Sequence, residues 1–130
     1  MRELKFRGIN ANGKMVYGML VKDIPDSTFY YDEYPNRICW DEGTAHCNMP
    51  VKKDTEGQFT GLLDKNGNEI YEGDLLKDST GVSSVTWNEK FSSFCLTRRG
   101  WLSNHFFGEA ADPEDCEVIG NVHQNIEILK

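Results

Sequence analysis

Residues 57–74 read GQFTGLLDKNGNEIYEGD, which places strand-forming segments on either side of a turn sequence. The Asn66-Gly67 pair supplies the residue types that accept the positive φ of a tight hairpin turn. Glu72-Gly73-Asp74 forms the next bend, and a further strand begins at Asp74. The sequence therefore predicts a β-hairpin that leads directly into a third strand.

The rest of the C-terminal part continues as short strands separated by turns. Residues 82–87 and 91–97 are rich in strand formers, contain interspersed serines and are linked by a short polar turn. Asp112-Pro113, with acidic residues behind it, predicts a single helical turn. Residues 116–121 predict a closing strand, and Asn125 is placed to cap a last turn.

The N-terminal part begins with another hairpin. Residues 4–7 and 15–21 are strand-forming, and residues 10–13 between them have the composition of a turn. Residues 23–53 are interrupted by prolines, so we interpret them as a loop with one or two short strands. The best segments for such strands are residues 29–31 and 38–40.

Many short strands at close spacing favour a mainly β fold, either a small barrel or a sandwich. At 130 residues the chain fits one ordinary domain, or one small domain with an appended part. Hydrophobic residues make up 38% of the chain, which suffices for a packed core. The predicted core consists of Phe59, Leu62, Ile70, Tyr71, Leu75, Trp87 and Ile119.

No segment is typical of a membrane span or of a secretion signal. No apolar run approaches the roughly 20 residues that cross a bilayer, and the N-terminal residues lack an apolar core with a cleavage site. We therefore expect a cytoplasmic protein with no membrane contact. Because thiols are kept reduced in that compartment, we expect all four cysteines to be free. They are Cys39, Cys47, Cys95 and Cys116.

Charge is distributed unevenly along this acidic chain, which has a net charge of -7. Residues 1–53 hold eight Lys and Arg against seven Asp and Glu, whereas residues 54–130 hold six against fourteen. Phosphate backbones are bound mainly by clustered Lys and Arg, so the C-terminal part is a poor candidate for wrapping nucleic acid.

Several stretches together resemble the YopX family of phage and prophage proteins. They are residues 2–8, 16–18, 57–74 and 117–121, together with Asn125 and Leu129. The resemblance spans nearly the whole chain, and residues 57–74 are its most specific part. Ile126 stands where the family pattern has a proline, which bears only on the last turn.

The resemblance implies a phage or prophage protein in the cytoplasm of a bacterial host cell. It also implies an SH3-like barrel in the C-terminal part. We therefore expect residues 54–130 to form that barrel, and residues 1–53 to form a β-hairpin and an irregular segment packed on it. The family has no characterised role, so it implies neither catalytic residues nor a cofactor.

A metal site is not expected. The closest candidate ligands are Cys39, His46 and Cys47, and the other cysteines and histidines are distant in sequence. Zinc sites typically pair ligands two to four residues apart in Cys-x-x-Cys-like motifs, and no such motif occurs. Moreover, two adjacent residues point to opposite faces of a strand.

The sequence patterns that could indicate a catalytic site are equally unspecific. Residues 44–47 and 103–105 bring hydroxyl or thiol groups near histidines, but catalytic triads assemble in space and not by adjacency. Glu72 with Asp74, or Glu114 with Asp115, could divide acid and base roles, yet an exposed acidic turn gives the same pattern. We therefore predict that the protein is not an enzyme.

Two kinds of binding surface remain as hypotheses. An acidic surface, suited to a basic host or phage protein, includes Glu69, Glu72, Asp74 and Asp78. A basic and aromatic surface, suited to nucleic acid as the alternative partner, includes Arg98, Arg99 and Trp101, with a second basic group at Arg2, Lys5, Arg7 and Lys14. We favour the protein partner.

Overall fold

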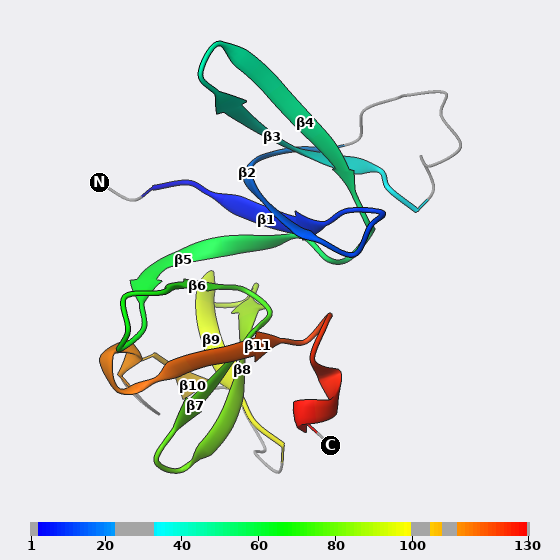
Figure 1. Cartoon of the computed structure of the whole chain (residues 1–130). Coiled ribbons are helices and arrows are strands. Elements are labelled where there is room, and N and C mark those ends of the chain that lie inside the picture. The colour runs from blue at the N-terminus through cyan, green and yellow to red at the C-terminus, as the bar shows by residue number, and fades with distance from the viewer. Residues whose placement is uncertain (1–2, 23–32, 100–104, 108–111, 130) are drawn as a thin grey trace. The chain divides into compact units, whose positions relative to one another are not determined.

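The computed structural model describes residues 3–22, 33–99, 105–107 and 112–129. These residues form strands and two short 3₁₀ turns, so the protein is mainly β (Figure 1). No helix among them is long or apolar enough to cross a membrane. The chain divides into two compact units, Met1–Phe59 and Thr60–Lys130.

The first unit is an antiparallel sheet in the order β4-β3-β2-β1-β5. Its strands are β1 (Phe6–Ile9), β2 (Met15–Val21), β3 (Asn36–Glu42), β4 (Ala45–Val51) and the first residues of β5 (Gly57–Leu63). The predicted N-terminal hairpin is confirmed, because β1 pairs with β2 around a turn in which Gly13 has a φ of 79°. Asn10 holds this turn, since its Oδ1 accepts hydrogen bonds from the backbone N–H groups of Asn12 and Lys14, both at 3.0 Å.

Strand β2 changes partners at Gly18. Gly18 is paired with Phe6 of β1, whereas Met19 is already paired with Cys39 of β3. A Cβ atom on Gly18 would lie 2.2 Å from the carbonyl oxygen of Cys39, so a residue with a side chain would force the two strands apart. The switch leaves the far ends of β3 and β4 as a two-stranded hairpin that projects from the sheet (Figure 1).

The expectation of an irregular segment is wrong for β3 and β4. The two strands pair along their whole length around a two-residue turn, in which Gly43 has a φ of 60°. Pro50 did not prevent a strand because it lies on β4, the terminal strand of the sheet, opposite Arg37. The predicted strand at residues 38–40 falls within β3, whereas the one at residues 29–31 lies outside the described residues.

The second unit contains the β5–β6 hairpin and a five-stranded antiparallel sheet in the order β10-β9-β8-β7-β11. Its further elements are β6 (Glu69–Tyr71), β7 (Asp74–Asp78), β8 (Gly81–Asn88), β9 (Ser93–Thr97), β10 (His105–Phe106), η1 (Pro113–Asp115), β11 (Glu117–Asn121) and η2 (Ile126–Leu129). The predicted hairpins, the single helical turn, the closing strand and the last turn are therefore confirmed. The SH3-like barrel is not confirmed, because the pairings of the described strands leave an open sheet that ends at β10 and β11.

Asp64 joins the β5–β6 turn to the last strand of the second unit. Its Oδ1 accepts hydrogen bonds from the backbone N–H groups of Asn66 at 2.9 Å and Asn68 at 2.8 Å. Its Oδ2 accepts one from the N–H of Val118 on β11, at 2.9 Å. Burial by itself would raise the pKa of Asp64, but these donors outweigh it and lower the pKa below the ordinary value of 3.8.

The bend after β6 is held in a similar way. Asp74 is buried, and its Oδ2 accepts a hydrogen bond from the backbone N–H of Tyr71 at 2.7 Å. Gly73, with a φ of 93°, donates its N–H to the carbonyl of Val85 and accepts from the N–H of Val122, both at 2.8 Å. The bend therefore contacts both β8 and the residue that follows β11.

The core of the second unit differs in part from the predicted one. Its centre consists of Ile70, Leu76, Val85, Leu96 and Cys116, with partly buried Leu62, Phe94, Phe107 and Val118 around it. Of the other predicted members, Tyr71 and Leu75 are also buried, Ile119 is half-buried, and Phe59 is buried but is the last residue of the first unit. Trp87 was predicted wrongly, because 40% of its surface is exposed. Trp87 lies two residues after the buried Val85, so its side chain is on the same face of β8. The strand has already extended past the edge of the core at that position, and Trp87 is therefore exposed.

Replacing Asp64 with Asn should remove about 3 kcal/mol of stability at neutral pH, because a buried charged acceptor of several hydrogen bonds is lost. A lowered pKa in the folded state stabilises the fold above pH 3.8, and this contribution disappears as pH falls through the folded-state pKa. Urea titrations from pH 7 to pH 2.5 should therefore show a shallower acid loss in D64N than in the wild type. Equal steepness in both proteins would contradict this role.

Replacing Trp87 with Ala should cost only about 1 kcal/mol, mainly for the lost contact with Phe94. Leu76→Ala, in the centre of the core, should cost about 3 kcal/mol because it leaves a cavity. Chemical denaturation of the two variants measures both values. A larger loss for Trp87→Ala than for Leu76→Ala would place Trp87 in the core after all.

Candidate functional site

Arg98, predicted as a binding residue, is engaged inside the second unit. Its Nη1 donates to Thr80 Oγ1 at 2.8 Å, its Nη2 donates to Ser83 Oγ at 2.8 Å, and its Nη2 lies 3.5 Å from Asp78 Oδ2. The side chains of Arg98 and Asp78 are only 15% and 9% exposed. Arg98, which directly follows β9, thus ties the end of this strand to the β7–β8 turn.

Asp78 shapes the same turn. Its Oδ1 accepts hydrogen bonds from the backbone N–H and the hydroxyl of Thr80, at 2.7 and 2.6 Å, and from the N–H of Gly81 at 3.1 Å. Burial would raise the pKa of Asp78, but the Thr80 hydrogen bonds and the charge of Arg98 outweigh it and lower the pKa below 3.8. Asp78 is therefore a structural carboxylate.

The other predicted binding residues do not form one surface. Asp74 is buried, Glu72 is half-buried, and Glu69 accepts a hydrogen bond from the Tyr71 hydroxyl at 3.1 Å. Arg99 is exposed, and Trp101 lies outside the described residues.

The basic group of the N-terminal hairpin is also dispersed. Arg7 is only 5% exposed, so its guanidinium does not belong to a surface patch. Lys5 lies 3.6 Å from the Glu3 carboxylate and over the ring of Phe59, whereas Lys14 is exposed. Arg2 is outside the described residues.

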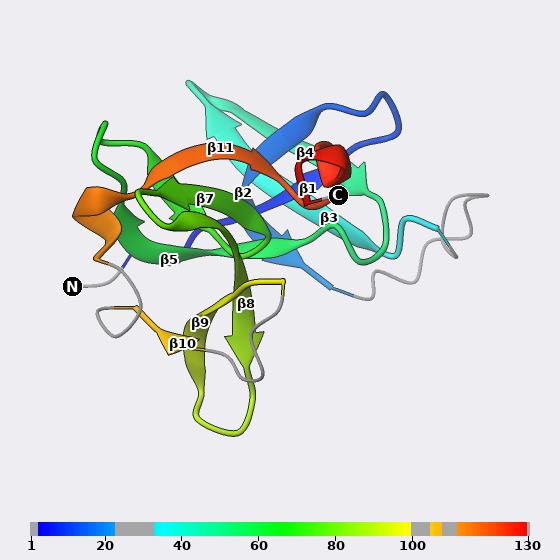
Figure 2. The ribbon, with the colours of Figure 1, turned by 90° about the horizontal axis from the view of Figure 1, so that it is seen from below.

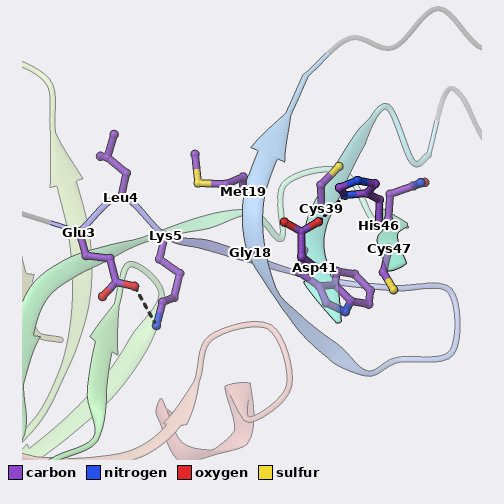
Figure 3. A pocket seen from close by; sticks show the side chains of 11 residues that line it. Glu3, Leu4, Lys5, Gly18, Met19, Cys39, Asp41, His46 and Cys47 are labelled. Atoms are coloured by element: carbon purple, nitrogen blue, oxygen red, sulfur yellow. Dashed lines mark hydrogen bonds and ion pairs between the residues drawn. The ribbon is translucent and has the colours of Figure 1, made fainter. Parts of the chain in front are cut away.

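The first unit contains a groove of about 490 Å³ beside the point where β2 changes partners. Its lining residues are Glu3, Leu4, Lys5, Gly18, Met19, Cys39, Trp40, Asp41, His46, Cys47 and Asn48. In Figure 3, β2 with Gly18 runs between Leu4 on one side and the β3–β4 residues on the other. The groove carries a Glu3–Lys5 pair at 3.6 Å and an Asp41–His46 pair at 2.5 Å.

The three residues considered as metal ligands, Cys39, His46 and Cys47, all line this groove. Cys39 faces Asn48 and Cys47 faces Trp40 in the strand register, so the two thiols belong to opposite faces of the hairpin. His46 is instead paired with Asp41. No group of three or more His, Cys, Asp or Glu side chains suited to a metal occurs among the described residues.

Exposed aromatic side chains gather at the end of the β8–β9 hairpin in the second unit. Trp87 and Phe94 form an edge-to-face pair with ring centroids 4.9 Å apart, and Phe91 and Phe106 form another at 5.7 Å. Trp87, Phe91 and Phe106 are 40%, 59% and 38% exposed. We call Trp87, Phe91, Phe94 and Phe106 the aromatic hairpin end; Figure 2 shows this hairpin projecting from its unit.

The two aromatic pairs lie on opposite faces of the hairpin. Trp87 is paired with Phe94 in the register and shares the face of Val85, whereas Phe106 is paired with Cys95 on the other face. The exposure of Trp87 was not predicted, because alternation along the strand places Trp87 inward and says nothing about where the core ends. The one sequence feature that indicated exposed aromatic side chains here was Phe91, which directly follows the predicted polar turn.

The fold and these surfaces define a small, mainly β protein of two units, with no metal-binding cluster among the residues that the structure describes. A family model described as YopX protein matches residues 5–130, so the chain belongs to the YopX family. The crystal structure of protein EF1440 from Enterococcus faecalis is similar in fold, with a TM-score of 0.55, 20% identity and full coverage of both chains. No curated protein matches the chain.

Arg98→Ala should destabilise the second unit by about 2 kcal/mol, because it leaves buried Asp78 without its cation. Arg99→Ala, one residue further and exposed, should change stability by less than about 0.5 kcal/mol. Thermal unfolding of both variants measures the difference. Equal effects of the two substitutions would contradict the structural assignment of Arg98.

Proposed function

We propose that this protein is a non-enzymatic binding module encoded by a phage or prophage, and that its partner is another protein. The aromatic hairpin end of the second unit makes the contact. The observation that carries this proposal is the exposure of Trp87 and Phe91 on the projecting β8–β9 hairpin, with the exposed ring of Phe106 on the adjacent β10 in contact with Phe91. Exposed aromatic groups of this kind are typical of the energetic centres of protein interfaces.

The backbone of the hairpin turn supports the proposal. Ser92 has a φ of 48°, a left-handed conformation that is uncommon for residues other than glycine. The N–H of Phe91 donates to Asn88 Oδ1 at 3.1 Å, which fixes the turn from within. The turn thus keeps a costly conformation while it presents Phe91, the most exposed aromatic side chain described.

The charge of the second unit favours a basic partner. Asp64, Asp74 and Asp78 have structural roles, so the acidic surface falls on other carboxylates. The exposed ones among the described residues are Glu89, Asp112, Glu114, Asp115 and Glu127. Such a surface speeds the encounter with a basic protein and makes association weaken as salt rises.

Nucleic acid is the second candidate partner. Lys90 lies 5.4 Å from the centre of the Phe91 ring, and an exposed aromatic ring next to a cation can stack on a base. The exposed Arg99 would add a phosphate contact. We rank this function second because Arg98 is already engaged by Asp78 and Ser83.

The test is an affinity pull-down from the bacterial host with the wild type, the double variant Trp87→Ser/Phe91→Ser, and Leu63→Ser as a matched control. Leu63 is 50% exposed in the same unit, and it lies on β5, which pairs with none of β8, β9 and β10. We expect a specific protein to be retained by the wild type and by Leu63→Ser, to be lost with the double variant, and to elute with salt.

Two results would contradict the proposed protein-binding function. Tight binding to single-stranded DNA or RNA that falls steeply with salt and is lost in Arg99→Ser would favour the nucleic-acid function. Retention of the same protein by the double variant would remove the aromatic hairpin end from the interface.

A further inference from the structure

We infer that the outer edge of β4 in the first unit is an interface at which two copies of this chain pair as antiparallel strands centred on Cys47. Among the described strands, β4 is the terminal one of its sheet. A terminal strand presents unpaired N–H and C=O groups along one side, which makes it a template for a strand of another chain.

The register of the β3–β4 hairpin shows which groups point outward. Glu42 and Ala45 flank the two-residue turn and form a hydrogen-bonded pair, and such pairs alternate with pairs that do not bond to each other. The non-bonded positions on β4 are therefore His46, Asn48 and Pro50. Pro50 agrees with this assignment, because it has no N–H to donate to Arg37.

The outward groups are thus the N–H and C=O of His46 and of Asn48, together with the carbonyl of Pro50. None of these groups takes part in the non-ladder backbone hydrogen bonds found in the described part of the chain. Within the described part of the chain, two donors and three acceptors of β4 therefore face outward, where a neighbouring strand can pair with them.

Apart from Pro50 near its end, this edge lacks the features that protect other edges. Residues 45–51 read AHCNMPV and carry no Lys, Arg, Asp or Glu. The sheet of the second unit ends instead at β10, which has two residues, and at β11, which begins with Glu117 and has a register shift between Val118 and Gly120. Short length, charge and bulges are the usual means of preventing edge-to-edge pairing.

A second copy fits this edge because the strand is self-complementary. With Cys47 opposite Cys47 of the partner copy, His46 faces Asn48 and Ala45 faces Met49, so no like charges meet. The outward N–H and C=O groups of His46 and Asn48 then form four hydrogen bonds. A register centred on Asn48 would also form four hydrogen bonds, but it would leave the His46 carbonyl opposite Pro50, which has no N–H to donate. The register centred on Cys47 instead pairs every outward N–H and C=O of His46 and Asn48, so it is the one we propose.

This register brings the two Cys47 thiols together across the symmetry axis. They occupy a non-hydrogen-bonded pair, in which opposite Cα atoms lie about 4.5 Å apart. That separation is within the range that a disulfide can bridge. Cys39 has the same intermediate burial, but it lies on β3 between two paired strands, which makes it a matched control.

The first test is oxidative trapping of the full chain with copper phenanthroline in air, which removes two electrons and two protons from a pair of thiols. We expect the wild type and Cys39→Ser to form a covalent dimer rapidly, and Cys47→Ser to form none. Equal trapping of Cys47→Ser and Cys39→Ser, or no dimer in Cys39→Ser, would overturn the proposal.

The second test measures association under reducing conditions by sedimentation equilibrium. Asn48→Pro removes an outward N–H that β3 does not use, so the fold should persist while association weakens at least about tenfold. Asn48→Ser keeps the N–H and should associate as the wild type does. If Asn48→Pro does not fold, His46→Lys/Asn48→Lys replaces it and sets two cations against each other. Unchanged association in the folded variant would show that the interface lies elsewhere.

Discussion

A buried carboxylate, Asp64, joins the beginning of the second unit to its end. The hydrogen bond from Val118 to Asp64 spans 54 residues, and the N–H of Lys65 donates to the carbonyl of Cys116 beside it at 2.9 Å. Cys116 belongs to the buried core, so these bonds fix β11 over the hydrophobic cluster. The charge of Asp64 is tolerated in this position only because several donors replace the water that burial removes.

The same reasoning accounts for the run at residues 57–74, which is the most specific part of the resemblance to the YopX family. Asp64 and Asp74 accept backbone hydrogen bonds, and Gly67 and Gly73 have φ values of 81° and 93°. These residues build turns and contacts within the unit. The most specific part of the family resemblance therefore describes the scaffold, and the interaction surfaces that we propose lie outside this run.

Both units present such side chains on hairpins that extend beyond the paired or buried part of the structure. In the first unit, β3 and β4 extend beyond their pairing with β2, because β2 changes partner at Gly18. In the second unit, the β8–β9 hairpin extends beyond the hydrophobic core and carries the exposed rings of Trp87 and Phe91. The interaction surfaces proposed for this protein are therefore consequences of where strand pairing and burial stop.

The sequence by itself determined the local structure, because turns depend on a few neighbouring residues. Asn66-Gly67, residues 10–13 and Asp112-Pro113 each marked a turn that the structure contains, and the strands between them followed from composition. Only the tertiary structure decided that Arg98 pairs with Asp78, that Trp87 is exposed, and that Pro50 lies on an edge strand. These outcomes depend on which distant segments meet. Alternation along a strand reports the face of a side chain, but the extent of the core and the neighbour at an edge are set by pairing across the whole sheet.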